Sequence, residues 1–167
     1  MNYLKAFSIA LLISSLLLTV HAADNGSPKF SDYSVDTLYT GKPVPVQLKT
    51  KDDKMFRTRL QDSETMPISF AGEYAIVTWG CGTGCLFGAA VSHKTGKVHW
   101  LPGDGLIQHG KTVWDNDEPL THRSSSSLIV IYAIRGEEPG ENDEGMVHFY
   151  SLDEAKGFQF IKSLPKL

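Results

Sequence analysis

Short apolar runs separated by glycine, proline and aspartate dominate the chain from residue 72 onward. Runs of this length, with few helical repeats among them, are typical of short β-strands joined by turns. Six runs predict strands, one group at residues 74–79, 86–93 and 97–101 and another at residues 128–134, 146–152 and 158–162. We therefore predict a mainly β fold with two three-stranded units, arranged as an antiparallel meander sheet, a sandwich or an open barrel.

The two groups of strands resemble each other, and both end in a Leu-Pro pair, at residues 101–102 and 164–165. One interpretation is two consecutive meanders, and the other is an internal repeat. Two units are too few for a propeller, which needs about four blades. A long connection, residues 103–127, lies between the groups, and long connections of this kind are often functional.

One segment before the strands has a helical pattern. Thr50, followed three residues later by Asp53, fits a capping box. Beyond it, apolar side chains and one arginine stem recur on one helical face, at Met55, Phe56, Arg59 and Leu60. We predict one short helix at residues 51–63. The preceding residues 36–48 contain Gly41, Pro43 and Pro45, which favour an extended loop or an edge strand.

The N-terminus has the pattern of a secretion signal. Lys5 precedes an apolar stretch at residues 6–20, and Val20-His21-Ala22 suits signal cleavage. We expect a signal peptide at residues 1–22 and a single β-rich domain at residues 23–167, periplasmic or secreted. An uncleaved membrane anchor is the alternative, although the apolar stretch is shorter than the ~20 residues that span a bilayer. No later stretch is long enough to span a membrane.

The charge of the chain bears on the class of partner. The formal net charge is −3, and Lys5 is the one charged residue of the expected signal peptide, so its removal gives −4. Proteins that bind nucleic acid present a basic face to the phosphates, so this mild acidity argues against a nucleic-acid partner. A protein or a component of the cell envelope is the expected partner, and the pattern gives no prediction of oligomeric state.

Both cysteines lie in one glycine-rich turn, Trp79-Gly80-Cys81-Gly82-Thr83-Gly84-Cys85. If residues 82–84 form a three-residue turn, Cys81 faces Cys85 directly, and residues 75, 77 and 79 face residues 91, 89 and 87. A Cys81–Cys85 disulfide is then sterically feasible, and an oxidising compartment favours it. A redox pair usually has two intervening residues at a helix N-terminus, and a metal site needs further ligands. We predict a clamped hairpin tip.

The turn also carries a resemblance. The pattern Phe70-Ala71-Gly72, then Thr78-Trp79-Gly80-Cys81-Gly82-Thr83-Gly84-Cys85, then Thr95-Gly96-Lys97-Val98 resembles a group of small exported bacterial proteins of unknown function. The resemblance covers about residues 30–102. It implies a bacterial exported protein and no particular activity.

Two histidines are candidates for metal binding or acid–base chemistry. A three-residue turn at residues 94–96 places His93 and His99 on one face as diagonal neighbours, ~7–8 Å apart. A two-residue turn at Thr95-Gly96 places them on opposite faces. The alternative to a site is two ordinary histidines of the surface or core.

The remaining candidates lie in acidic loops and aromatic side chains. Residues 115–118 and 137–144 carry carboxylates that could bind Ca²⁺, but neither has the spacing of an EF-hand, so solvated loops are the favoured interpretation. Aromatic side chains could line a sugar or peptide groove, although strand aromatics usually belong to a core: Trp79, Trp100, Trp114, Tyr132 and Tyr150. Trp114 is the one predicted to lie in a loop.

Catalytic signatures are missing from the sequence. It contains no nucleophile elbow, no zinc-protease motif, no P-loop and no dinucleotide fingerprint, and we expect no cofactor. The leading hypothesis is a non-enzymatic exported binding or inhibitor-type protein that uses the clamped tip, with Trp79, Gly82, Thr83, Gly84 and Trp114 as contact residues. The alternatives are an enzyme acting on the cell envelope through His93 and His99 or the acidic loops, and a structural envelope protein.

Overall fold

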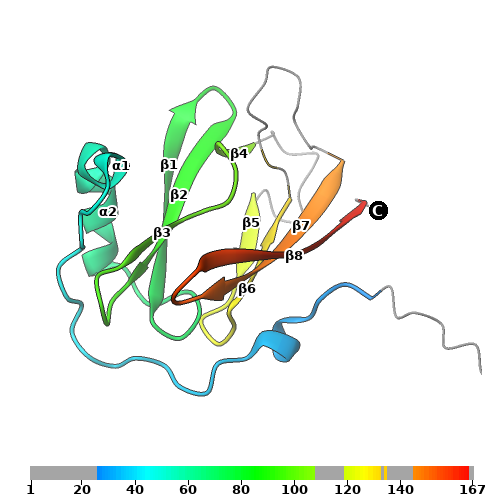
Figure 1. Cartoon of the computed structure of the whole chain (residues 1–167), viewed down its shortest axis with the longest axis horizontal. Coiled ribbons are helices and arrows are strands. Elements are labelled where there is room, and N and C mark those ends of the chain that lie inside the picture. The colour runs from blue at the N-terminus through cyan, green and yellow to red at the C-terminus, as the bar shows by residue number, and fades with distance from the viewer. Residues whose placement is uncertain (1–25, 108–118, 133, 135–144, 166–167) are drawn as a thin grey trace, which may run out of the picture.

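The fold is mainly β, as predicted. The structure is a computed structural model that describes residues 26–107, 119–132, 134 and 145–165. Within these residues the strands form two antiparallel sheets and no closed barrel (Figure 1). Four short helical segments accompany them: η1 (Phe30–Tyr33), α1 (Lys51–Met55), α2 (Arg57–Gln61) and η2 (Asp62–Thr65).

The first sheet contains the first predicted meander. Strands β1 (Tyr74–Gly82), β2 (Cys85–Ser92) and β3 (Val98–Trp100) follow one another, and β4 (Leu106–Ile107) pairs with the same strand β2 as β3 does. The predicted pairs of β1 and β2 are confirmed at Trp79↔Phe87, Val77↔Ala89 and Ala75↔Val91. The register changes near the tip, at a bulge between Gly80 and Gly82.

The second sheet contains the second meander and one additional strand. Its order is β5 (Leu120–His122), β6 (Leu128–Ile131), β7 (Met146–Asp153) and β8 (Gly157–Pro165). The predicted connection at residues 103–127 therefore includes two strands, β4 and β5, that the sequence pattern did not show. They are two and three residues long, too short for an alternating pattern to be recognised.

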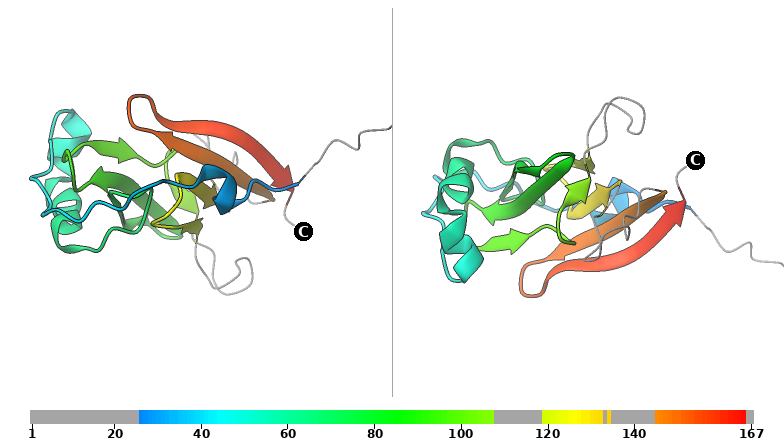
Figure 2. Two further views of the ribbon diagram at one scale, coloured as in Figure 1. Left: turned by 90° about the horizontal axis from the view of Figure 1, so that it is seen from below. Right: turned by 90° about the horizontal axis from the view of Figure 1, so that it is seen from above.

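Three apolar clusters of the described residues pack on the faces of the sheets. One lies between the two sheets and includes Phe70, Ile76, Ala90, Ile129 and Ile131. A second lies between the first sheet and the helices, and a third lies between the second sheet and the N-terminal segment that carries η1. Because both faces of β1, β2 and β6 are covered, these strands are apolar at nearly every position. Figure 2 shows α1 and α2 at one end of this stack of layers.

The predicted helix is divided in two. Phe56, with φ −98° and ψ 21°, separates α1 from α2, and η2 continues the segment to Thr65. The prediction of one continuous helix at residues 51–63 is wrong, since the helix is interrupted at Phe56, whose ring packs on aromatic side chains of the first sheet. The predicted capping box of Thr50 and Asp53 is confirmed. No helix of the described part of the chain is long and apolar enough to cross a membrane.

The segment before α1 is extended, and it connects the two halves of the fold. The Val35 N–H donates to Ser125 O at 3.0 Å, beside the second sheet. Further along, the Val44 N–H donates to His93 O at 2.9 Å and the Gln47 N–H to Gly96 O at 2.8 Å, beside the first sheet. Figure 1 shows this segment running below both sheets, which it ties together by backbone hydrogen bonds.

Candidate functional site

The disulfide between Cys81 and Cys85 is present, as predicted. The two residues are not directly opposed, however: Gly82 pairs with Cys85, and Cys81 occupies the bulge. The turn is therefore a two-residue loop, Thr83-Gly84, and the predicted three-residue turn is wrong. The bulge still leaves the two Cα atoms 5.2 Å apart, well within the range of disulfides.

The tip beyond the disulfide is exposed. Gly82, Thr83 and Gly84 all face solvent, and the two glycines have φ of 134° and 67°. Residues with a side chain rarely adopt these angles, so the turn requires glycine at both positions. A Cβ at Gly80 or Gly82 would meet no atom within 4 Å, so the backbone here is bare on its outer side.

Trp79 does not belong to this exposed surface. Its side chain is 8% exposed and faces the helices, where its ring centroid lies 5.3 Å from that of Phe56. Phe87 and Trp100 complete the cluster, with centroids 6.5 and 5.7 Å from that of Trp79. Trp79 is therefore a core residue beneath the tip, which corrects its predicted place among the contact residues.

The disulfide supports a second loop. A Cβ at Gly105 would lie 3.1 Å from the Sγ of Cys85 and 3.5 Å from the Sγ of Cys81, so this loop packs directly on the two sulfurs. Immediately after it, β4 pairs with β2 at Leu86↔Leu106. The clamp therefore lies between the exposed tip on one side and the loop of residues 102–105 on the other.

The loop of residues 102–105 connects β3 and β4, which both pair with the same edge of β2 but are separated by a gap in the pairing. The Leu101 N–H donates to Gly88 O at 3.0 Å, and the chain returns to β2 where Leu106 faces Leu86. Residues 102–105 therefore stand opposite one residue, Phe87, and they must arch away from the sheet. Gly103 and Gly105, with φ of 81° and 138°, permit the arch.

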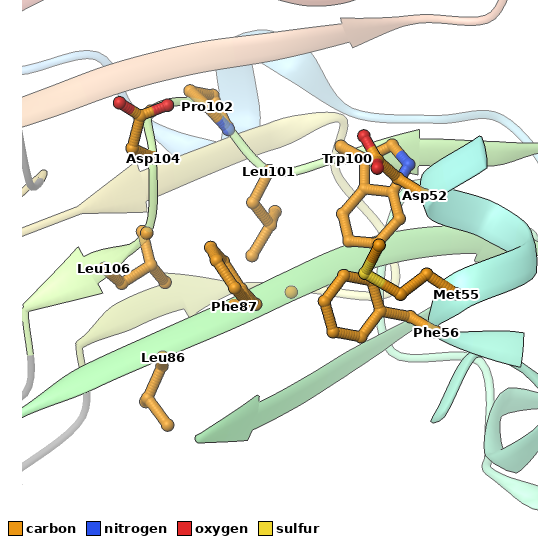
Figure 3. A pocket seen from close by; sticks show the side chains of 13 residues that line it. Asp52, Met55, Phe56, Leu86, Phe87, Trp100, Leu101, Pro102, Asp104 and Leu106 are labelled. Atoms are coloured by element: carbon orange, nitrogen blue, oxygen red, sulfur yellow. The ribbon is translucent and has the colours of Figure 1, made fainter. Parts of the chain in front are cut away.

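An open groove of about 560 Å³ lies between this arch and α1 (Figure 3). Its floor is formed by β2, and Figure 3 shows Phe87 between the side chains of α1 and those of residues 102–106. Most of the lining side chains are apolar: Met55, Phe56, Leu86, Phe87, Trp100, Leu101, Pro102 and Leu106. Among the residues that the structure describes, the charged side chains lining it are two carboxylates, Asp52 on α1 and Asp104 on the arch.

One buried carboxylate fixes the α1 wall of the groove. Asp53 is 3% exposed, and its Oδ2 accepts from the Thr50 N–H at 2.7 Å and from the Lys49 N–H at 2.9 Å. Its Oδ1 accepts from Nε1 of Trp100 at 3.0 Å. Burial raises the pKa of the Asp53 carboxyl, but the hydrogen bonds with Thr50, Trp100 and Lys49 outweigh burial and hold the pKa below its ordinary value.

The two candidate histidines lie on opposite faces of the first sheet. His99 pairs with Ala90, so Ser92 faces Lys97 and a four-residue loop joins β2 and β3; both predicted registers are wrong. His99 faces the second sheet, with its ring centroid 5.8 Å from that of Tyr74. His93 faces the helices, and its Nε2 lies 2.8 Å from Ser63 O. The fold does not bring them into one site.

The remaining candidates do not enter the described site. Trp114, residues 115–118 and residues 137–144 lie outside the described residues. Among the residues that the structure does describe, no three histidine, cysteine or acidic side chains are grouped to hold a metal ion. Tyr150 packs on the cluster between the two sheets and Tyr132 on the cluster between the second sheet and the N-terminal segment, and neither lines the groove.

The groove itself was only partly foreseen. The sequence suggested Trp100 as a residue that could line a groove. It did not suggest Met55, Phe87 or Asp104, because their roles depend on how α1 and the arch are placed over the sheet. The one signal in the sequence is the pair of glycines around Asp104, which marks an irregular backbone. Comparison with protein-family models, curated proteins and solved structures found no match to the chain. The assignment of a function therefore rests on the geometry of the tip and of the groove.

Proposed function

We propose that this chain is an exported, non-enzymatic binding protein that presents the clamped tip to a partner protein or to an envelope component. The observation that carries the proposal is the exposure of residues 82–84 above a disulfide that closes their loop. A preformed loop loses less conformational entropy on binding than a flexible one, so rigidity here favours recognition. The tip suits an inhibitor-type contact by analogy with other rigid loops.

Gly80 supports this proposal because neither its backbone conformation nor a neighbour in the described part of the chain requires glycine there. Its φ is not among the positive values of the chain, and a Cβ there would meet no neighbour within 4 Å. Glycine inside a strand costs about 0.5–1 kcal/mol relative to alanine. A bare backbone beside the tip allows close approach of a partner's backbone, which accounts for a glycine that the fold does not need.

The expected compartment is one in which a disulfide-clamped tip is stable. The disulfide and the predicted signal peptide at residues 1–22 both favour a periplasmic or secreted protein. In an oxidising compartment the bond persists, so the tip keeps one shape while it meets its partner.

Capture from an envelope extract of the source cells tests the proposal. Immobilised wild type is compared with Thr83→Arg and Gly80→Val, which enlarge the exposed surface of the tip. Gly145→Val is the matched control, because Gly145 is also exposed, also lacks neighbours within 4 Å and directly precedes β7. Thermal unfolding verifies that all variants keep the fold.

We expect wild type and Gly145→Val to retain the same protein or envelope component, and both tip variants to lose it. Equal capture by all four proteins would show that the tip is not the contact surface. Capture of nothing by wild type would also count against a binding function.

A further inference from the structure

We propose that the apolar groove beside the tip binds an apolar or aromatic side chain of a partner protein that carries a lysine or arginine next to it in sequence. This inference rests on the proposed binding function and names the chemistry of the partner. It concerns a surface separate from residues 82–84, on the other side of the disulfide.

The groove has the dimensions and lining of an anchor site. Its volume of about 560 Å³ is ample for one large side chain and its neighbours. Met55 is 62% exposed, and Phe87 and Trp100 are only partly buried although they are large and apolar. Anchoring side chains of protein partners typically enter such preformed apolar pockets and supply much of the binding energy.

The charges at the rim select the partner. Asp52 and Asp104 are both exposed and lie on opposite walls of the groove, whereas no lysine, arginine or histidine of the described residues lines it. Two carboxylates repel a fatty acid or an anionic lipid headgroup, so an acyl chain is disfavoured. They attract a cationic residue beside the anchoring side chain, and a lysine or arginine there can also lie over the face of Trp100.

The groove is continuous with the tip through the backbone. Leu86, in the floor of the groove, directly follows Cys85, and Gly105, in the arch, packs on both sulfurs. One partner can therefore contact the tip and place a side chain in the groove at the same time. The disulfide holds both surfaces in a fixed relation.

Two pairs of variants separate the groove from general surface effects. Asp52→Lys/Asp104→Lys reverses the charge of the rim, and Asp36→Lys/Asp62→Lys makes the same change at two exposed carboxylates outside the groove. Met55→Ala removes an exposed apolar side chain from the wall, and Met66→Ala removes one elsewhere. All these side chains are exposed, so we expect the fold to be retained, as thermal unfolding can verify.

The probe is a displayed library of random peptides, selected on the immobilised, disulfide-bonded mature protein. Enriched sequences are synthesised, and their affinities are measured by fluorescence polarisation at low and high salt. We expect them to carry an apolar or aromatic residue within two positions of a lysine or arginine. The rim reversal should weaken their binding about tenfold, Met55→Ala should weaken it severalfold, and both controls should match wild type. Added salt should weaken binding to wild type.

Other outcomes overturn the inference. Enriched peptides that are acidic or uncharged contradict the proposed chemistry, and so does the absence of any peptide above background. Peptides that bind the groove variants as they bind wild type, but do not bind Thr83→Arg, would place recognition at the tip alone. That result would contradict the groove as a binding site and would leave the proposed binding function intact. Equal capture of envelope components by wild type and the tip variants would instead contradict the proposed function.

Discussion

At the scale of single residues, interactions between neighbours in the sequence could be predicted, whereas interactions between distant residues could not. The capping box of Thr50 and Asp53 spans three residues, and it forms as predicted. The bond from Trp100 to the same Asp53 carboxylate joins residues 47 positions apart, and no sequence pattern shows it. One aspartate therefore starts α1 and also fixes α1 against the first sheet.

Asp53→Ala tests this double role. The variant removes a helix cap and leaves Nε1 of Trp100 without its acceptor, so we expect a loss of about 2 kcal/mol in the free energy of unfolding. Asp52→Ala, at the adjacent exposed position, should cost no more than about 0.5 kcal/mol. Urea unfolding of both variants measures the difference, and similar losses would contradict the role assigned to Asp53.

We expect His99 to make the stability of the fold depend on pH. Burial, and then the charge of Lys97, lower the pKa of His99 below its ordinary value, although Glu154 and Asp153 raise it in part. Below about pH 6.5 the His99 side chain is therefore protonated in the unfolded chain but still neutral in the folded chain. The free energy of unfolding consequently falls as the pH falls from this value toward the pKa of folded His99. Urea unfolding between pH 7.5 and 5.5 should show a steeper loss for wild type than for His99→Gln. Parallel pH profiles would contradict the assignment.

At the scale of elements, the hairpin illustrates the limit of pattern reading. The register of β1 and β2 was predicted from a three-residue turn, and it is correct at three pairs because a two-residue loop and one bulged residue together give the same offset between the strands. The bulge at Cys81 and the two-residue loop were not predicted, because they leave the pairing of the strands beyond Gly80 the same as a three-residue turn would. The disulfide tolerates this change, since a bulged and a paired residue still lie close together.

Cys81→Ser/Cys85→Ser tests the role of the disulfide as a support for β4. Removal of a bond that closes so small a loop should cost about 2 kcal/mol. We further expect faster amide hydrogen exchange at Leu106, because Gly105 packs on the sulfurs. Exchange at Val91, in the middle of the first sheet, is the internal reference once the global loss of stability is subtracted. Equal protection of Leu106 with and without the bond would show that the loop does not depend on it.

At the scale of the whole molecule, the two sheets share one apolar cluster. Ile76 and Ala90 enter it from the first sheet, and Ile129 and Ile131 enter it from β6 of the second. The extended segment before α1 adds backbone hydrogen bonds to both halves. Because neither sheet buries this face without the other, we expect the two halves to unfold together, in agreement with the single domain predicted at residues 23–167.

Ile129→Ala tests this coupling. Ile129 is fully buried, so the cavity should cost about 3 kcal/mol, whereas Leu38→Ala at an exposed position should change little. Tryptophan fluorescence follows mainly the first sheet, where Trp79 and Trp100 lie, and far-ultraviolet circular dichroism follows all strands. We expect both probes to shift together in one transition. Two separate transitions would show that the sheets unfold independently.

The sequence by itself determined the features that depend on neighbours along the chain. Short apolar runs between turn residues specified the strands of both meanders, the Thr50–Asp53 spacing specified the start of a helix, and the cysteine spacing specified the disulfide. The tertiary structure decided where distant segments meet. It separated His93 from His99, buried Trp79, and opened the groove between α1 and the arch at Asp104. Such features depend on packing between residues far apart in the chain, which leaves no periodic signal in the sequence.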